Sequence, residues 1–228
     1  MPIDRSIVTK KDIELGYDAI AEKMYVSEDY YNDMLAIERD FRGDILEAGV
    51  GQGTVLKKIS ERGGKNIKSL TGIDLSSRLL EMAKKIIPQA KLVKGDAEAM
   101  PFPDKSFDFV VMVGVFPYLL DVDKALAEVK RVLRSDGKFI VTVPNRKWIL
   151  FENYIKSRRN IQPVEDRFFD FEEMKGLLEK HDFSVIGYRG ADALRFYGWK
   201  HKFDRLAVAV LPFLQKRMKH LVFRCKLN

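Results

Sequence analysis

The sequence predicts an α/β fold with a doubly wound, mostly parallel sheet. Short apolar runs alternate with helix-like stretches from Asp44 to Asn145, which is the repeated strand-then-helix order of such a sheet. The runs are nearly continuous Val, Ile, Leu and Phe, as expected for strands that are buried on both faces. Glycines or carboxylates directly follow three of these runs, and ligands in open parallel sheets bind beyond the carboxyl ends of the strands. A length of 228 residues suffices for one such domain.

Residues 11–40 precede the alternating region and have helical spacing. Apolar or aromatic side chains recur at turn-length intervals: Ile13, Tyr17, Ile20, Met24, Tyr31 and Leu35. This pattern predicts two short amphipathic helices before the core.

The core is expected to alternate strands and helices in chain order. The expected strands are residues 44–49, 69–74, 90–96, 107–115 and 137–145, and the expected helices are residues 54–61, 77–87 and 124–133. Ser76 and Ser77 can cap the second helix, and Pro88 follows its end. Ser135, Asp136 and Gly137 are expected to break the third helix before the next strand.

The chain is less regular after Pro144. A helix is expected at 171–181, a strand at 183–188 and a final strand at 220–223. Residues 189–219 would then form an insertion before that last strand.

Composition and cysteine content exclude several classes of protein. Hydrophobic residues make up 46% and charged residues 32%, which argues against long disorder. The single cysteine, Cys225, cannot form an internal disulfide, and no Cys/His cluster has metal-site spacing, so we expect a cytoplasmic protein without a bound metal. The start of the chain lacks the apolar stretch of a signal peptide, and no run reaches the roughly 18 residues of a transmembrane helix.

The net charge of +7 belongs to one part of the chain. Residues 195–228, called the basic segment below, contain nine Lys or Arg and one acid, Asp204, whereas residues 1–194 sum to −1. Positive charge beside Phe196, Tyr197 and Trp199 can attract phosphates, an anionic membrane or nucleic acid. A solvated face or a core-forming insertion explains the same composition, and these readings stay open.

The first motif is the stretch Glu47–Gly53, between an expected strand and an expected helix. Its glycines, Gly49, Gly51 and Gly53, allow a sharp turn and a close approach of a ligand to the backbone. A dinucleotide GxGxxG motif would need its third glycine at position 54, where the chain has Thr54. The spacing is therefore that of an acidic GxGxG loop, which alone could be an ordinary turn.

Two carboxylates end the next two strands. Asp74 lies 21 positions after Gly53, where an acid can accept hydrogen bonds from both ribose hydroxyls; the alternative role is an N-cap, which Ser76 already offers. Asp96 follows Gly95, and its carboxylate can accept from an exocyclic amine while the backbone amide of Ala97 donates to a ring nitrogen. These two groups together would recognise adenine.

With these motifs in order, the chain resembles the class I S-adenosylmethionine-dependent methyltransferases, especially the branch of the ubiquinone and menaquinone biosynthesis methyltransferases. The resemblance runs from about Tyr17 to Phe183 and rests on ILEAGVGQG, GIDLSSRLLEMAKK, KGDAEAMPFPDKSFDFVVMVGVFPYLLD and VLRSDGKFIVTVPN. It implies a seven-stranded sheet with an antiparallel last strand. The single domain, 1–228, would comprise a helical lid (1–40), a cofactor-binding core (41–188) and a basic aromatic insertion with the final strand (189–228).

The resemblance also assigns roles to residues around S-adenosylmethionine. The implied contacts are Gly49, Gly51 and Gly53 near the methionine portion, Asp74 on the ribose, Leu75 against the adenine, Asp96 and Ala97 on the adenine edge, Val113 near the sulfonium, and Tyr17 as a lid tyrosine; Glu47 is a further cofactor-binding residue.

The chain departs from many relatives after the fourth strand. It has Gly114 and Tyr118 where they have Glu and His, so a histidine base is lost there, and Tyr118 is either a hydroxyl partner or an apolar wall. The stretch Val115–Tyr118 also lacks the Asn/Asp-Pro-Pro-aromatic signature of enzymes that methylate base amines.

We therefore expect methyl transfer to a small-molecule or lipid-linked acceptor by direct in-line displacement, giving S-adenosylhomocysteine. The alternatives are a nucleic-acid methyltransferase that uses the basic segment, and a cofactor-binding scaffold without turnover. Candidate acceptor-binding side chains are Arg146, Arg167, Arg195, His201 and His220, while His181 is expected to be structural. The acceptor, the atom methylated and the oligomeric state are not determined by the sequence.

Overall fold

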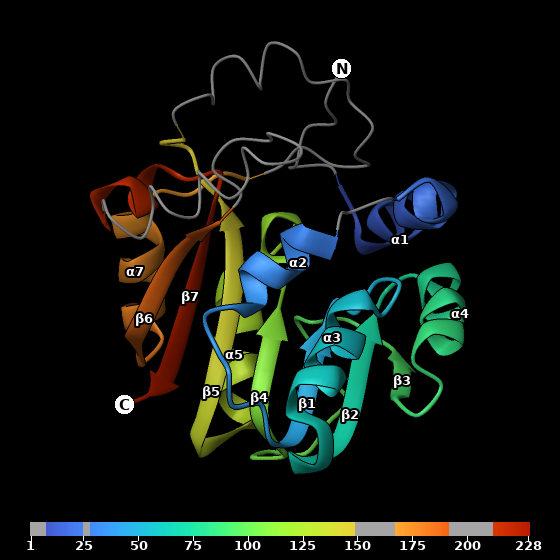
Figure 1. Cartoon of the computed structure of the whole chain (residues 1–228). Helices are drawn as coiled ribbons and strands as arrows, with labels where there is room; N and C mark the ends of the chain where they lie inside the picture. The colour runs from blue at the N-terminus through green and yellow to red at the C-terminus, as the bar shows by residue number, and fades with distance from the viewer. Residues whose placement is uncertain (1–7, 25–27, 149–166, 192–211) are drawn as a thin grey trace.

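One seven-stranded sheet forms the centre of the molecule, with the strand order β3-β2-β1-β4-β5-β7-β6 (Figure 1). The computed structural model describes residues 8–24, 28–148, 167–191 and 212–228. The strands are β1 (Gly43–Ala48), β2 (Ile67–Asp74), β3 (Lys91–Lys94), β4 (Phe107–Met112), β5 (Leu133–Pro144), β6 (Phe183–Ala191) and β7 (His220–Leu227). Pairing from β3 to β5 is parallel, and β7 runs antiparallel to both β5 and β6. The predicted fold class is confirmed.

Helices cover both faces of this sheet. They are α1 (Lys10–Ile20), α2 (Glu28–Leu35), α3 (Thr54–Gly63), α4 (Ser77–Ile86), α5 (Val122–Val132) and α7 (Phe171–Lys180), with 3₁₀ turns at Ala21–Lys23, Gly64–Asn66, Phe116–Tyr118 and Pro212–Arg217. One buried cluster joins α5 and α7 to the sheet through Leu126 and Leu178, and the other joins α2 and α3 through Leu35 and Leu56. The sheet is therefore doubly wound.

The two N-terminal helices were predicted from spacing and are confirmed. A capping box starts α1, in which Thr9 and Asp12 exchange side-chain and backbone hydrogen bonds. Figure 1 shows α1 beside α4 at the β3 side of the sheet, while α2 packs on α3 and β6. Both helices thus reach the edge at which the parallel strands end.

Some predicted boundaries are wrong. Helix α5, which is the third helix predicted for the core, is followed directly by β5 at Leu133, although Ser135–Gly137 was expected to form a break. The pairing of β4 with β5 jumps between Phe107 and Phe109, so the extra residues are absorbed in an irregular strand. Arg134 holds this segment, because its guanidinium contacts Asp108 at 2.6 Å and Asp44 at 2.9 Å.

The ends of two strands also differ from the predicted ones. β4 stops at Met112 instead of residue 115, and Gly114 just beyond has φ +72°, which is outside the extended region. β7 continues to Leu227, beyond the expected residue 223, because it pairs along both β5 and β6. In the part of the chain that the structure describes, no helix has the length and apolar character needed to cross a membrane.

Candidate functional site

The glycine loop leaves the carboxyl end of β1 and leads into α3. The amides of Gly49 and Val50 donate to the carbonyl of Ile73 at 2.7 and 3.0 Å, so the loop is fixed to β2. Gly49 has φ +78°, and a Cβ there would lie 2.0 Å from Val115. Gly51 has φ +51°, and a Cβ there would meet no atom of the described residues within 4 Å. The space outside Gly51 is therefore open to a ligand, whereas Gly49 is required by packing.

Glu47, at the end of β1, is 2% exposed. Burial raises the pKa of its carboxyl well above the usual value, and the nearby charge of Asp74 acts in the same direction. Burial, together with the negative charge of Glu47, raises the pKa of Tyr31 on α2 to about 12. The Oε2 atom of Glu47 has no hydrogen-bond partner among the described residues. A buried polar atom without a partner is costly, so this oxygen indicates a position for a ligand's donor group.

Asp74 ends β2 directly beside the glycine loop. Its Oδ2 accepts from the amide of Gly51 at 2.8 Å, and its Oδ1 accepts from the amide of Ser76 at 2.9 Å. Burial raises the pKa of Asp74, although these amides act against the shift. The N-cap of α4 is Ser76, whose hydroxyl accepts from Leu79, so Asp74 is not a cap. Each carboxylate oxygen has further lone pairs, which leaves Asp74 able to accept from hydroxyl groups.

Asp96 follows β3 and stands next to Asp74 along the sheet edge, because the amide of Gly95 donates to the carbonyl of Asp74 at 3.0 Å. The Oδ1 atom of Asp96 accepts from the amide of Glu98 at 2.9 Å and from Lys10 on α1 at 3.1 Å. Ala97 is 7% exposed and packs into the core. The structure therefore brings the glycine loop and both carboxylates to one edge.

Three other predicted site residues meet in a small apolar cluster. Tyr17 from α1, Leu75 after β2 and Tyr118 in its 3₁₀ turn pack around Val8 and Ile13. The Tyr17 and Tyr118 rings lie edge to face, with centroids 5.5 Å apart. This packing places the Tyr118 ring in an apolar wall, and the hydroxyl-partner role stays a prediction.

Val113 and Gly114 lie beyond β4, near the middle of the same edge. Val113 is buried in the cluster under α2. The amide of Gly114 donates to the Thr142 hydroxyl at 3.0 Å, and a Cβ on Gly114 would meet no atom within 4 Å in the part of the chain that the structure describes. The sequence alone did not indicate this space. The positive φ of Gly114, which sets the direction of its Cβ position, is known only from the structure.

Two contacts at this edge were not predicted. Gln52 in the glycine loop donates to the carbonyls of Ala21 and Met24, at 2.7 and 3.3 Å, and so joins the loop to the N-terminal segment. Lys10 reaches Asp96 from the start of α1. A glutamine in a loop and a lysine at the start of an amphipathic helix carry no sequence signal for such long-range contacts.

The comparisons with known proteins agree with this arrangement. Residues 46–141 match the family model described as a methyltransferase domain. An uncharacterised protein of Methanocaldococcus jannaschii is 30% identical over 209 residues, which cover 78% of each chain. The demethylmenaquinone methyltransferase of Thermotoga maritima is 29% identical over 147 residues, covering 58% of this chain and 62% of that one.

This chain belongs to the class I S-adenosylmethionine-dependent methyltransferases. A solved S-adenosylmethionine-dependent methyltransferase of Thermotoga maritima, described as a possible histamine N-methyltransferase, has the same fold, with a TM-score of 0.71 and 21% identity over 95% of this chain and all of that one. The cofactor of the methyltransferase is S-adenosylmethionine, and hydrogen-bond acceptors and space that fit it lie at this edge. The orphaned Glu47 oxygen, the open side of Gly51 and the remaining lone pairs of Asp74 are its features.

Arg146, a candidate acceptor-binding residue of the methyltransferase, and His181 both have partners within the fold. Arg146 pairs with Glu173 at 3.0 Å and donates to the carbonyl of Phe168. His181 contacts Asp123 at 2.6 Å beyond α7, which agrees with its expected structural role. Arg195 and His201 lie outside the described residues.

His220 lies in the final strand, which the sequence predicted at 220–223. It begins β7, opposite Pro144 and Ala191, and its ring packs edge to face on Tyr30 of α2 at 5.1 Å. It therefore lies in the sheet, at the edge that carries the site. Partly buried Arg167 precedes α7.

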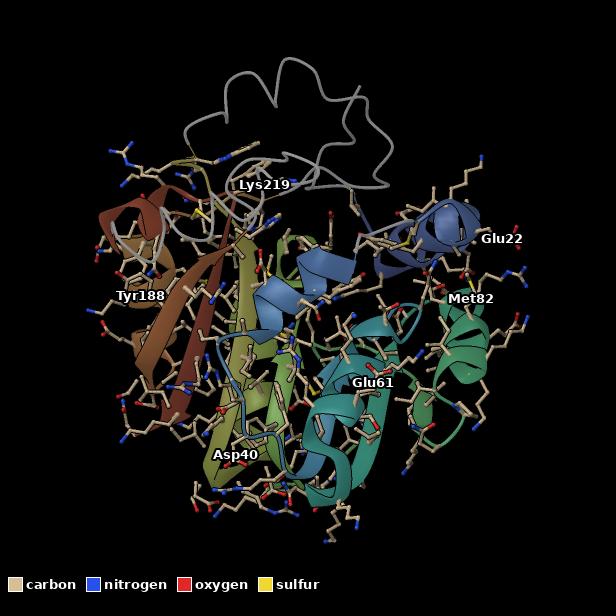
Figure 2. All side chains as sticks on the ribbon, viewed as in Figure 1. Glu22, Asp40, Glu61, Met82, Tyr188 and Lys219 are labelled. Atoms are coloured by element: carbon tan, nitrogen blue, oxygen red, sulfur yellow. The ribbon has the colours of Figure 1, made fainter. Side chains whose placement is uncertain are left out.

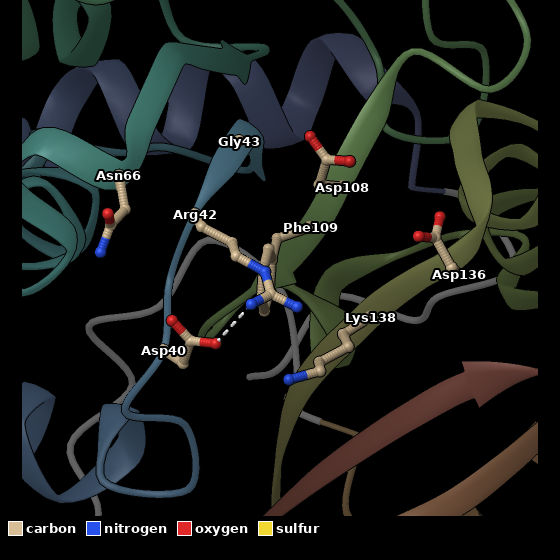
Figure 3. Close-up of a pocket in the computed structure, with 8 residues that line it drawn as sticks. All are labelled: Asp40, Arg42, Gly43, Asn66, Asp108, Phe109, Asp136 and Lys138. Atoms are coloured by element: carbon tan, nitrogen blue, oxygen red, sulfur yellow. Dashed lines mark hydrogen bonds and ion pairs between the residues drawn. The ribbon is translucent and has the colours of Figure 1, made fainter.

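A separate hollow of about 500 Å³ lies at the opposite edge of the sheet (Figure 3). It is lined by Asp40, Arg42, Gly43, Asn66, Asp108, Phe109, Asp136 and Lys138. Arg42 pairs with Asp40 at 2.9 Å, and Lys138 pairs with Glu38 at 2.7 Å. Because Gly43 begins β1, this hollow is at the amino end of the strands, away from the glycine loop.

Proposed function

We propose that the methyltransferase transfers its methyl group to a small or lipid-linked acceptor with an apolar ring. The observation that carries the proposal is the apolar cluster of Tyr17, Leu75 and Tyr118 at the edge where the parallel strands end, close in the chain to Gly114, whose Cβ position meets no described atom within 4 Å. Two relatives are named for compounds that contain rings: the demethylmenaquinone methyltransferase of Thermotoga maritima, and a sterol 4-C-methyltransferase of Caenorhabditis elegans that is 31% identical over 128 residues, covering 54% of this chain and 33% of that one.

The chain's own groups would bind and orient the two reactants. S-adenosylmethionine supplies an activated methyl group when bound. Glu47 and the glycine loop would hold the amino-acid end, Asp74 the ribose hydroxyls and Asp96 the adenine amine. The apolar side chains would align the acceptor with the methyl group and exclude water, which is the main requirement of direct displacement. Tyr118 would serve as part of this wall and not as a base.

The basic segment gives weaker support to nucleic acid as the acceptor. Several of its described cations already have partners within the fold: Lys216 pairs with Glu172 at 2.8 Å and lies over the Phe171 ring, and Arg224 contacts Glu38. Paired cations attract phosphates less strongly, because the neighbouring acid offsets their charge. Peripheral contact with an anionic membrane would depend on residues 192–211, which lie outside the described ranges.

Release of S-adenosylhomocysteine in a panel of acceptors tests the proposal. The panel contains short-chain quinols, phenols, a sterol, histamine, a short single-stranded RNA and a duplex DNA. We expect release with ring acceptors and none with the nucleic acids. Release with RNA or DNA alone would replace this proposal with the nucleic-acid alternative, and binding of S-adenosylmethionine without any release would favour a scaffold.

Flotation with vesicles tests the membrane contact separately. Vesicles of anionic and of neutral lipids are mixed with the protein at low salt. Binding to the anionic vesicles only would support a peripheral protein that meets a lipid-linked acceptor. Equal absence from both would limit the acceptor to small molecules in solution.

A further inference from the structure

Helix α1 carries a row of charged residues that faces the adenosine side of the site. The row has a spacing of four residues, which places its members on one helix face: Lys10, Glu14, Asp18 and, in the following turn, Glu22. Glu14 pairs with Lys94 at 2.7 Å, Asp18 accepts from the Ser76 hydroxyl, and Glu22 pairs with Arg78. Figure 2 shows Glu22 beside α4, where Met82 is labelled. This helix is therefore joined to β3 and α4 along its length.

Lys10, at the start of this row, contacts two carboxylates. Its ammonium group lies 3.1 Å from Asp96 Oδ1 and also contacts Glu98 Oε1. The side chains of Lys10, Asp96 and Glu98 are 29%, 26% and 7% exposed. Glu98 in turn accepts from the amide of Leu120 at 2.7 Å. Lys10 thus neutralises two neighbouring carboxylates, whereas the more exposed pair of Glu22 with Arg78 contributes little.

The contacts of Asp96 are divided unequally between its two oxygens. Oδ1 accepts from Lys10 and from the amide of Glu98, whereas Oδ2 has no partner among the described residues. Two donors on one oxygen fix the rotation of the carboxylate. The other oxygen then stays available at a set position for a further donor.

We propose that Lys10 is a positioning residue for the adenine of the cofactor. It holds Asp96 through Oδ1, so that Oδ2 accepts from the exocyclic amine, and it thereby couples docking of α1 to binding of the adenosine. This inference rests on the proposed role of Asp96 as the adenine-binding acid. Without Lys10 the carboxylates of Asp96 and Glu98 would repel each other, and Asp96 would turn away from its position.

Calorimetry with two product analogues tests this role without any acceptor. The ligands are S-adenosylhomocysteine and S-inosylhomocysteine, which has a 6-oxo group in place of the 6-amino group. We expect the unmodified protein to prefer the adenosine compound by about tenfold or more, since a carboxylate accepts from an amine and not from a carbonyl. In Lys10→Met we expect adenosine binding to fall about five- to tenfold and the preference to shrink by a similar factor.

Two matched variants separate positioning from helix stability. Lys11→Met removes the same charge from the same helix but only an intrahelical pair with Glu14, so we expect both constants to stay within about twofold. Lys10→Arg keeps the charge and should restore most of the preference. Circular dichroism of each variant checks that the fold is retained.

Each of the other outcomes would contradict the proposal, and each would do so for a different reason. If Lys10→Met weakens both ligands equally, Lys10 only holds the helix. If it tightens adenosine binding, Lys10 competes with the adenine for Asp96. If the unmodified protein binds both compounds equally, Asp96 does not read the base, and if it binds neither, the assignment of the whole site fails.

Discussion

Asp74 has a structural contact that the sequence did not predict. It was predicted as the ribose-binding acid, and it also fixes the glycine loop through the amide of Gly51. Removal of the whole carboxylate would disturb both the loop and the ligand contact. Asn retains one acceptor oxygen and a similar shape, so it is the cleaner substitution.

We expect Asp74→Asn to weaken S-adenosylhomocysteine binding by about 1 to 3 kcal/mol, because hydrogen bonds to a charged acceptor are lost. Isothermal titration calorimetry measures the loss. Asp136→Asn, at the opposite edge of the sheet, is the control and should bind normally. Unchanged affinity in Asp74→Asn would remove this residue from the proposed site.

Glu47 should lower the stability of the ligand-free protein while supporting binding. Burial raises its pKa above that of the unfolded chain, so the unfolded state loses its proton first as the pH rises from about 4.5. Stability therefore falls with rising pH over this window. Glu47→Gln should remove this dependence and raise the ligand-free melting temperature at pH 7, yet weaken S-adenosylhomocysteine binding.

Thermal melts at pH 4 to 8, with and without S-adenosylhomocysteine, measure both effects. A lower melting temperature in the ligand-free variant would mean that Glu47 is stabilising and has a donor in the free protein. Gln is the matched change, because it keeps the size and can still accept from the neighbouring backbone.

At the scale of elements, the glycine loop shows how one motif serves two requirements. Gly49 must be small because Val115 lies against it, whereas Gly51 faces open space. The GxGxG motif therefore contains one glycine that packing requires and one whose Cβ position is open among the described residues, and only the structure distinguishes them.

Alanine substitutions at these two positions should have different effects. Both adopt a positive φ, which costs an alanine about 1 kcal/mol. Gly51→Ala should lose little more stability than this but bind S-adenosylhomocysteine much more weakly, while Gly49→Ala should be clearly less stable because its Cβ would overlap Val115. Urea unfolding and calorimetry compare them; equal losses of stability would contradict this division.

The regular elements were predictable from periodicity because burial on both faces makes the central strands continuously apolar. The break predicted at Ser135–Gly137 does not form. Arg134 contacts Asp44 on β1 and Asp108 on β4, and these contacts keep the segment in the sheet. Local turn preference is weaker than a charged, partly buried network.

At the scale of the whole molecule, the two edges of the sheet have different roles. The carboxyl edge carries the glycine loop and both acids, and the amino edge carries the network of Arg134, Asp44 and Asp108. Burial alone would raise the pKa of Asp44, but hydrogen bonds from Ser69, Arg134 and Lys68 more than offset it, so the pKa is lowered. Asp44 therefore contributes stability above its unfolded pKa of 3.8, and this is lost on acidification.

We expect Arg134→Met to destabilise the protein by about 1 to 3 kcal/mol, because two carboxylates lose their shared partner. Urea unfolding at pH 7 measures this loss, and the difference from the unmodified protein should shrink as the pH falls below about 4. Affinity for S-adenosylhomocysteine should stay unchanged. A parallel loss of binding would show that the two edges are coupled.

The sequence by itself determined the fold class, the order of the elements and the family, because hydrophobic period and the glycine and acid motifs are local properties. It also placed Gly51, Asp74 and Asp96 at strand ends, which share an edge in any parallel sheet. Only the tertiary structure decided that Glu47 is buried with an unpaired oxygen, that Lys10 holds Asp96 and that His220 lies against Tyr30. These contacts join residues far apart in the chain, and burial and partners at such distances depend on the packing of the whole sheet and not on any local pattern.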